Sequence, residues 1–116
     1  MSEYVSAVLR EQLASRAGGR CEYCLIHEAD TMFPHEPDHI IALKHGGETQ
    51  LDNLAWACFV CNRFKGSDIA SIDPATDEIV PLFHPRRDDW NSHFECLATG
   101  KIVGTTARGR TTVFLL

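Results

Sequence analysis

Two Cys-x-x-Cys pairs constrain the fold of this chain more than any other feature. The pairs are Cys21/Cys24 and Cys58/Cys61. A two-residue spacer lets both thiolates of a pair reach one tetrahedral ion, so two pairs predict a closed four-cysteine structural zinc site. Four free buried cysteines or redox pairs are the alternative, which this spacing disfavours. The 25–57 segment between the pairs is longer than in a zinc ribbon, so we expect folded structure within it.

The length of 116 residues fits one domain with a modest core, to which a zinc site would add folding energy. An apolar fraction of 44% and a charged fraction of 23% are ordinary for a globular protein. The apolar runs are too short to span a bilayer, and the N-terminus lacks the pattern of a secretory signal. We therefore expect a cytoplasmic protein with no membrane partner. Cys96, the unpaired cysteine, is expected to be a buried thiol without a role.

Apolar periodicity predicts a helix over residues 2–17, capped by Ser2 and stopped by Gly18-Gly19. Short apolar runs predict strands at 38–43 and 54–58, separated by a loop. A helix is expected to follow from about residue 59 to residue 69. The predicted order between and just after the knuckles is therefore strand, loop, strand, helix.

Beyond about residue 72 the pattern predicts a short α/β extension without a linker or repeat. Trp90 and Phe94 should lie on the apolar face of a helix and belong to the core. We expect an edge strand at 79–83, a short helix at 90–97, and strand or loop segments at 100–104 and 111–116. The predicted fold class is α+β, with residues 1–116 forming one small domain.

Three polar residues between and just after the knuckles could hydrolyse a phosphodiester bond. His39 is the candidate general base, because imidazole can accept a proton near neutral pH. Its neighbour Asp38 offers a hard oxygen ligand suited to Mg²⁺ or Mn²⁺, and Asn62 offers a second, neutral oxygen. Adjacent residues on a strand point to opposite faces, so Asp38 and His39 can act together only where the strand twists or ends.

The series Asp38-His39, Gly46-Gly47, Asn53-Leu54 and Cys-x-x-Cys-Asn-x-x-Lys-Gly at 58–66 resembles the HNH endonuclease family, with its ββα-metal fold, over residues 20–70. The resemblance implies a DNA endonuclease in which His39 is the general base and Asp38 with Asn62 holds one divalent cation. It also implies that Asn53 orients the His39 ring and that Lys65 lies near the phosphate. Asn62 stands where the family name has its last histidine, which makes this an HNN variant and favours Mg²⁺ or Mn²⁺.

Each of these residues has a structural alternative that the sequence leaves open. His39 could be a hydrogen-bonded structural histidine, and Asn53 a turn residue. Asn62 could cap a helix. Lys65, with Arg63, could lie on a solvated helix face rather than contact phosphate.

The net charge of −5 argues mildly against a nucleic-acid partner. Glu36 could tune the site electrostatically, although we expect an exposed loop acid there. Four arginines of the extension could track a DNA backbone or be ordinary surface charge: Arg86, Arg87, Arg108 and Arg110. The acidic charge supports the alternative function, a non-catalytic zinc module that binds nucleic acid or protein.

Overall fold

The structure is a computed structural model that describes residues 4–116. The chain is of the α+β class, as predicted, and its contacts divide it into two compact units, Met1–Ser67 and Asp68–Leu116. That both units form a single domain stays a prediction. Among the described residues, no helix combines the length and the apolar character needed to cross a membrane.

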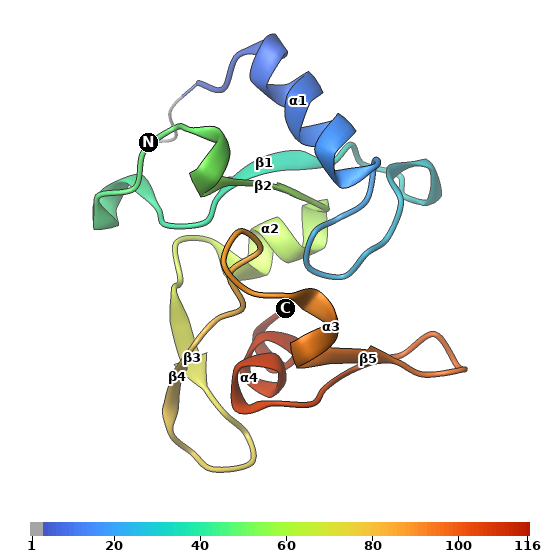
Figure 1. Ribbon diagram of the computed structural model, residues 1–116, viewed down its shortest axis with the longest axis vertical. Coiled ribbons are helices and arrows are strands. Elements are labelled where there is room, and N and C mark those ends of the chain that lie inside the picture. Colours follow the sequence, from blue (N-terminus) through green and yellow to red (C-terminus); the bar gives the residue numbers. More distant parts are fainter. Residues whose placement is uncertain (1–3) are drawn as a thin grey trace. The chain divides into compact units, whose positions relative to one another are not determined.

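The first unit is built around one antiparallel hairpin. Strand β1 (Glu36–His39) pairs with β2 (Leu54–Ala57), and helix α2 (Phe59–Lys65) follows directly. Helix α1 (Ala7–Ala17) lies on one side of this hairpin and α2 on the other (Figure 1). The predicted order of strand, loop, strand, helix is confirmed. Strand β1 begins and ends earlier than the predicted 38–43, and α2 ends before the predicted residue 69. Single-turn 3-10 helices occupy the connections at Glu28–Asp30, Leu43–His45 and Leu51–Asn53.

Helix α1 begins later than the sequence predicted. Residues 4–6 are not helical, and the side chain of Ser6 caps the first turn by accepting a hydrogen bond from the Leu9 amide. The predicted cap, Ser2, lies outside the described residues. Gly18 ends the helix with a left-handed φ of 62°, as expected of glycine at this position. The apolar periodicity places Val8 and Leu13 on one face of this helix, but only Leu13 is buried, and Val8 is 64% exposed.

The core of the first unit joins α1 to β2. Its buried side chains are Val5, Leu13, Leu54 and Trp56. The Arg16 guanidinium adds a polar tie, because it donates hydrogen bonds to the carbonyls of Leu51 and Leu54 at 2.8 and 2.5 Å. The start of β2 is therefore held to α1 by packing and by hydrogen bonds.

The second unit contains two further hairpins and a C-terminal helix. Its elements are β3 (Ala70–Ile72), β4 (Ile79–Pro81), α3 (Trp90–His93), β5 (Phe94–Cys96), β6 (Ile102–Gly104) and α4 (Ala107–Leu115). Strand β3 pairs with β4 and β5 with β6, both antiparallel. Phe94 is buried, as predicted, and Trp90 is half-buried.

Three expectations for this unit were wrong. The helix predicted at 90–97 ends at His93, where the chain turns into β5. The segment 111–116 lies in or next to helix α4 rather than in a strand or loop. Cys96 is exposed, because it lies on a two-stranded hairpin and not in a core.

Candidate metal and active site

The four knuckle cysteines form one cluster, with sulfur atoms all within 4.8 Å of one another. The first pair lies in the turn after α1, and Cys58 and Cys61 lie at the N-terminus of α2. Four sulfurs at about 2.3 Å from a central Zn²⁺ would be separated by about 3.8 Å. The Cys24 and Cys58 sulfurs are 3.7 Å apart, so the cluster fits a tetrahedral zinc site.

The protonation of these thiols is strongly interdependent. Hydrogen bonds to neighbouring sulfurs raise the pKa of Cys21 and of Cys61, and burial raises both further. Hydrogen bonds that Cys58 accepts from its neighbours lower the pKa of that thiol. Four thiolates so close together repel one another, so a cation is needed before all four can lose their protons.

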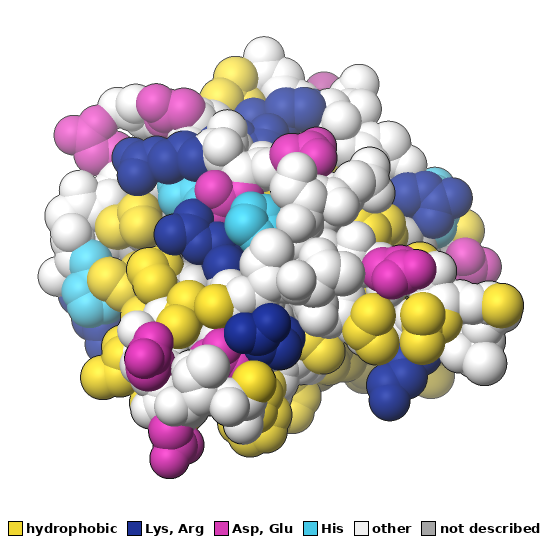
Figure 2. Space-filling view, turned by 60° about the horizontal axis from the view of Figure 1, so that its bottom comes forward, with side chains coloured by type: hydrophobic (Ala, Val, Ile, Leu, Met, Phe, Trp, Pro, Cys, Tyr) yellow, Lys and Arg dark blue, Asp and Glu magenta, His cyan; other side chains and the backbone are white. Residues whose placement is uncertain are grey.

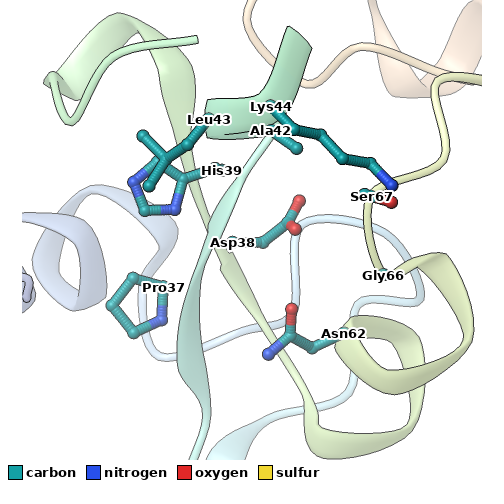
Figure 3. Close-up of a pocket in the computed structure, with 9 residues that line it drawn as sticks. All are labelled: Pro37, Asp38, His39, Ala42, Leu43, Lys44, Asn62, Gly66 and Ser67. Atoms are coloured by element: carbon teal, nitrogen blue, oxygen red, sulfur yellow. The ribbon is translucent and has the colours of Figure 1, made fainter. Parts of the chain in front are cut away.

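A pocket of about 360 Å³ opens where β1 ends beside α2. Asp38, His39 and Asn62 all line this pocket. Figure 3 shows the Asp38 and Asn62 side chains facing the same space on one side of β1, and the His39 ring on the other side of the strand. Strand β1 ends at His39, which is the condition under which two consecutive residues could share one site. The structure therefore brings Asp38, His39 and Asn62 to one pocket, in the first unit alone.

Two buried side chains, those of Tyr23 and Lys65, contact the Asp38 carboxylate. Tyr23 donates its hydroxyl proton to Asp38 Oδ2 at 2.6 Å, and Lys65 Nζ lies 3.3 Å from each carboxylate oxygen. Burial raises the pKa of Asp38, and the charge of Lys65 partly opposes this shift. Burial and the Asp38 charge raise the pKa of Tyr23, so its hydroxyl stays protonated. Each carboxylate oxygen can accept two hydrogen bonds, so these contacts leave room for a cation on the pocket side.

Two polar side chains, those of Thr49 and Asn53, fix the region around His39. The His39 Nε2 atom lies 2.9 Å from the Thr49 hydroxyl. The Asn53 side chain accepts a hydrogen bond from the Ile41 amide and donates to the carbonyls of Ile41 and Glu48, all at 2.9 Å. Asn53 thus clamps the chain just after His39 to the loop that carries Thr49.

Gly47 allows this clamp to form. A Cβ atom at Gly47 would lie 1.7 Å from the Ile41 carbonyl oxygen and 2.8 Å from the Asn53 amide nitrogen. No side chain fits there without displacing the backbone. The close approach explains why a glycine follows Gly46 in this loop.

The Asn62 side chain is tied to the first residue of β1. Its Nδ2 atom donates a hydrogen bond of 2.9 Å to Glu36 Oε2. Glu36 lies two residues before Asp38, on the same side of the strand, and is half-buried. The expectation of an exposed loop acid at Glu36 was therefore wrong.

The HNH endonuclease family matches residues 21–68, from the first knuckle cysteine to just beyond α2. Residues 21–68 form an HNH endonuclease domain. The match ends where the second unit begins, so it says nothing of residues 69–116. A search of the curated proteins found no match to this chain. The family implies nuclease activity on a nucleic acid, and the cysteine cluster is consistent with a structural zinc site within the same domain.

The burial of Lys65 and the hydrogen-bond partners of Asn53 differ from what the sequence predicted. Lys65 is only 2% exposed, and its ammonium also donates to the carbonyls of His39 and Ile40 at 3.2 and 3.1 Å. The alternative of a solvated helix face is therefore wrong for Lys65, and its place near the phosphate stays a prediction. The Asn53 side chain bonds to Ile41 and Glu48, so an effect on the His39 ring would pass through the backbone.

Tyr23, Thr49 and Glu36 are the polar residues at this site that sequence reasoning missed or misplaced. Tyr23 lies between the two cysteines of the first knuckle, and the cysteine spacing does not indicate its hydrogen bond to Asp38. Glu36 carried a usable signal, because a period of two places it on the same strand face as Asp38. Thr49 had no signal, since its contact with His39 depends on the path of the loop.

The placement of the cationic side chains bears on whether the second unit tracks a DNA backbone. On the face drawn in Figure 2, lysine and arginine side chains stand in separate groups among acidic and apolar ones. In the second unit, Arg108 pairs with Asp88 at 2.7 Å and Arg110 with Asp73 at 2.9 Å. These two arginines are committed to carboxylates, which weakens the hypothesis that they track a DNA backbone.

Proposed function

We propose that this protein is a metal-dependent endonuclease that hydrolyses DNA phosphodiester bonds. In this proposal His39 is the general base, Asp38 and Asn62 hold one Mg²⁺ or Mn²⁺ ion, and the four cysteines hold a structural Zn²⁺ ion. The observation that carries the proposal is that Asp38, His39 and Asn62 line one pocket at the end of β1. The side-chain oxygens of Asp38 and Asn62 suit a hard divalent cation.

His39 would take the proton from the attacking water. Thr49 bonds to Nε2, which restricts rotation of the ring. The chain that follows His39 is fixed by Asn53 and by the Lys65 contacts to the carbonyls of His39 and Ile40. The base is therefore held in one place before substrate arrives, which lowers the cost of reaching the reactive geometry.

Asp38 would remain ionised and point at the cation. A buried carboxylate is costly when it is charged, and Lys65 and Tyr23 offset that cost at Asp38. A bound Mg²⁺ or Mn²⁺ ion would stabilise the negative charge that develops on the phosphate and on the leaving oxygen. The buried Lys65 ammonium would position the Asp38 carboxylate and would not itself contact the cation.

The proposed zinc has a structural role and is distinct from the catalytic cation. Its four ligands fill a tetrahedral site, which leaves no open position for water or substrate. The ion would connect the turn after α1 to the N-terminus of α2. Tyr23, inside the first knuckle, then carries this rigidity to Asp38 through its hydroxyl.

Nicking of supercoiled plasmid by the zinc-loaded protein tests the proposal. We expect nicking only when Mg²⁺ or Mn²⁺ is added, and loss of nicking in the Asp38→Ala variant with the fold retained. The acidic net charge favours a second candidate, a zinc module that binds nucleic acid or protein without cutting it. A protein that retards DNA in a gel, but nicks it no faster with added metal, would support that candidate instead.

A further inference from the structure

The Asn62 amide has two ends, and only one of them can bind a cation. Its oxygen can act as a metal ligand, whereas its NH₂ group is a hydrogen-bond donor. A side-chain amide that rotates by half a turn exchanges these two groups. Some contact must therefore set the direction of the Asn62 amide before it can serve as a ligand.

Glu36 is placed to set that direction. An ionised carboxylate only accepts hydrogen bonds, so the atom that faces Glu36 Oε2 at 2.9 Å must be the NH₂ nitrogen of Asn62. The amide oxygen then points the other way. Figure 3 shows this oxygen on the side of Asn62 that faces Asp38, with the nitrogen turned away from the pocket.

The position of Glu36 on β1 fixes its contact with Asn62 relative to the rest of the site. Glu36 and Asp38 are separated by one residue of a strand, so both point toward α2. Register pairs Glu36 with Ala57 and Asp38 with Ala55, so the hairpin fixes the spacing of the two carboxylates. One strand thus supplies a proposed ligand and the group that would orient the other ligand.

Charge in the pocket supports the same assignment. Lys65 lies 3.3 Å from Asp38 and offsets the negative charge of that carboxylate. Glu36 then supplies the net negative charge beside the two oxygen ligands. A divalent cation is attracted to such a site without a second carboxylate ligand.

We propose that Glu36 is a positioning residue that fixes the Asn62 amide with its oxygen toward the cation. This inference rests on the proposed function, in which Asn62 is a metal ligand. A released Asn62 side chain has about three χ1 wells and two amide orientations. The correct orientation would then be populated about 2- to 6-fold less, and cation affinity would fall by the same factor.

Two neutral substitutions separate orientation from charge. Glu36→Gln retains an acceptor oxygen at the same reach, whereas Glu36→Ala retains none, and both remove the same charge. Mn²⁺ binding to the zinc-loaded full chain is measured by electron paramagnetic resonance of the free ion. We expect Glu36→Gln to bind Mn²⁺ about 2- to 6-fold more tightly than Glu36→Ala, and equal affinities would overturn the inference.

The same pair of substitutions is then made together with Asn62→Ala. With Asn62 removed, Glu36→Gln and Glu36→Ala should bind Mn²⁺ equally, because there is no amide left to orient. A difference that persists would show that Glu36 acts by another route and would overturn the inference. If Asn62→Ala alone leaves Mn²⁺ affinity unchanged, the proposed metal site itself is refuted. The metal concentration at half-maximal plasmid nicking should follow the same order, and thermal unfolding checks that each variant folds.

Discussion

Replacing Lys65 with methionine should destabilise the first unit strongly. Methionine keeps the unbranched length of lysine but removes its three N–H donors. Those donors serve the Asp38 carboxylate and the carbonyls of His39 and Ile40, at 3.1 to 3.3 Å. Without them, a carboxylate that is 3% exposed keeps, among residues 4–116, the hydrogen bond from Tyr23 alone.

The magnitude follows from the burial of the pair. Removing one partner of a buried ion pair costs about 3–5 kcal/mol, because the other charge stays buried without compensation. The Lys65 contacts are longer than the strongest charge-assisted hydrogen bonds, which measure about 2.7–2.9 Å. We therefore expect a loss near the lower limit, about 3 kcal/mol, and impaired cleavage because Asp38 is no longer held.

Urea unfolding of the zinc-loaded protein measures this loss. A Trp90→Phe background leaves Trp56 as the only tryptophan, and Trp56 belongs to the core of the first unit. Arg63→Met is the matched control, since it removes an exposed cation from the same helix and should cost less than about 1 kcal/mol. A similarly small loss for Lys65→Met, together with weaker DNA binding, would refute the buried role and indicate a phosphate contact.

Three further predictions concern acid stability, the zinc site and the loop clamp. The Arg110 guanidinium lowers the pKa of Asp73 below its ordinary value of 3.8, so the unfolded chain binds the proton more readily. Stability should therefore fall as pH drops below about 4, and Asp73→Asn should flatten this dependence in acid unfolding curves. Chelation of zinc should unfold the first unit, seen as exposure of Trp56, and unchanged fluorescence in the metal-free protein would contradict the zinc site. Gly47→Ala should lower stability by about 1–3 kcal/mol, because its Cβ would lie 1.7 Å from the Ile41 carbonyl oxygen; an unchanged melting temperature would contradict this.

The sequence was most informative where spacing alone determines geometry. The cysteine pairs predicted a four-sulfur cluster, and the structure brings all four sulfurs together. The order of strands and helix around them is also as predicted, because short apolar runs between turn residues have few other solutions. Asp38, His39 and Asn62 meet because this order places the end of β1 beside α2.

The sequence was misleading where tertiary contacts override local preference. Helix α4 contains β-branched residues that favour strands, including Thr111 and Thr112. Both hydroxyls bond to carbonyls one turn back, at Ala107 and Arg108, so these buried threonines are satisfied within the helix.

Charged residues at the pocket were misjudged for a related reason. Lysine is rarely buried. The residues next to Lys65 in the sequence do not indicate that its ammonium contacts Asp38 and two carbonyls about 25 residues away. Pro34 and Pro37 flank Glu36 and disfavour a regular element, which is why the sequence predicts a loop there. Yet the residue before a proline favours extended backbone, which suits the start of β1.

The rate of plasmid nicking by the His39→Ala variant shows whether His39 is the general base. Rates are compared at saturating Mn²⁺ with enzyme in excess, and His45→Ala is the control because His45 is an exposed histidine of the neighbouring 3-10 helix. We expect His39→Ala to cut about 10²- to 10⁴-fold more slowly than wild type, with zinc content and melting temperature unchanged. His45→Ala should cut at the wild-type rate. Equal rates for wild type and His39→Ala would show that His39 is not the general base.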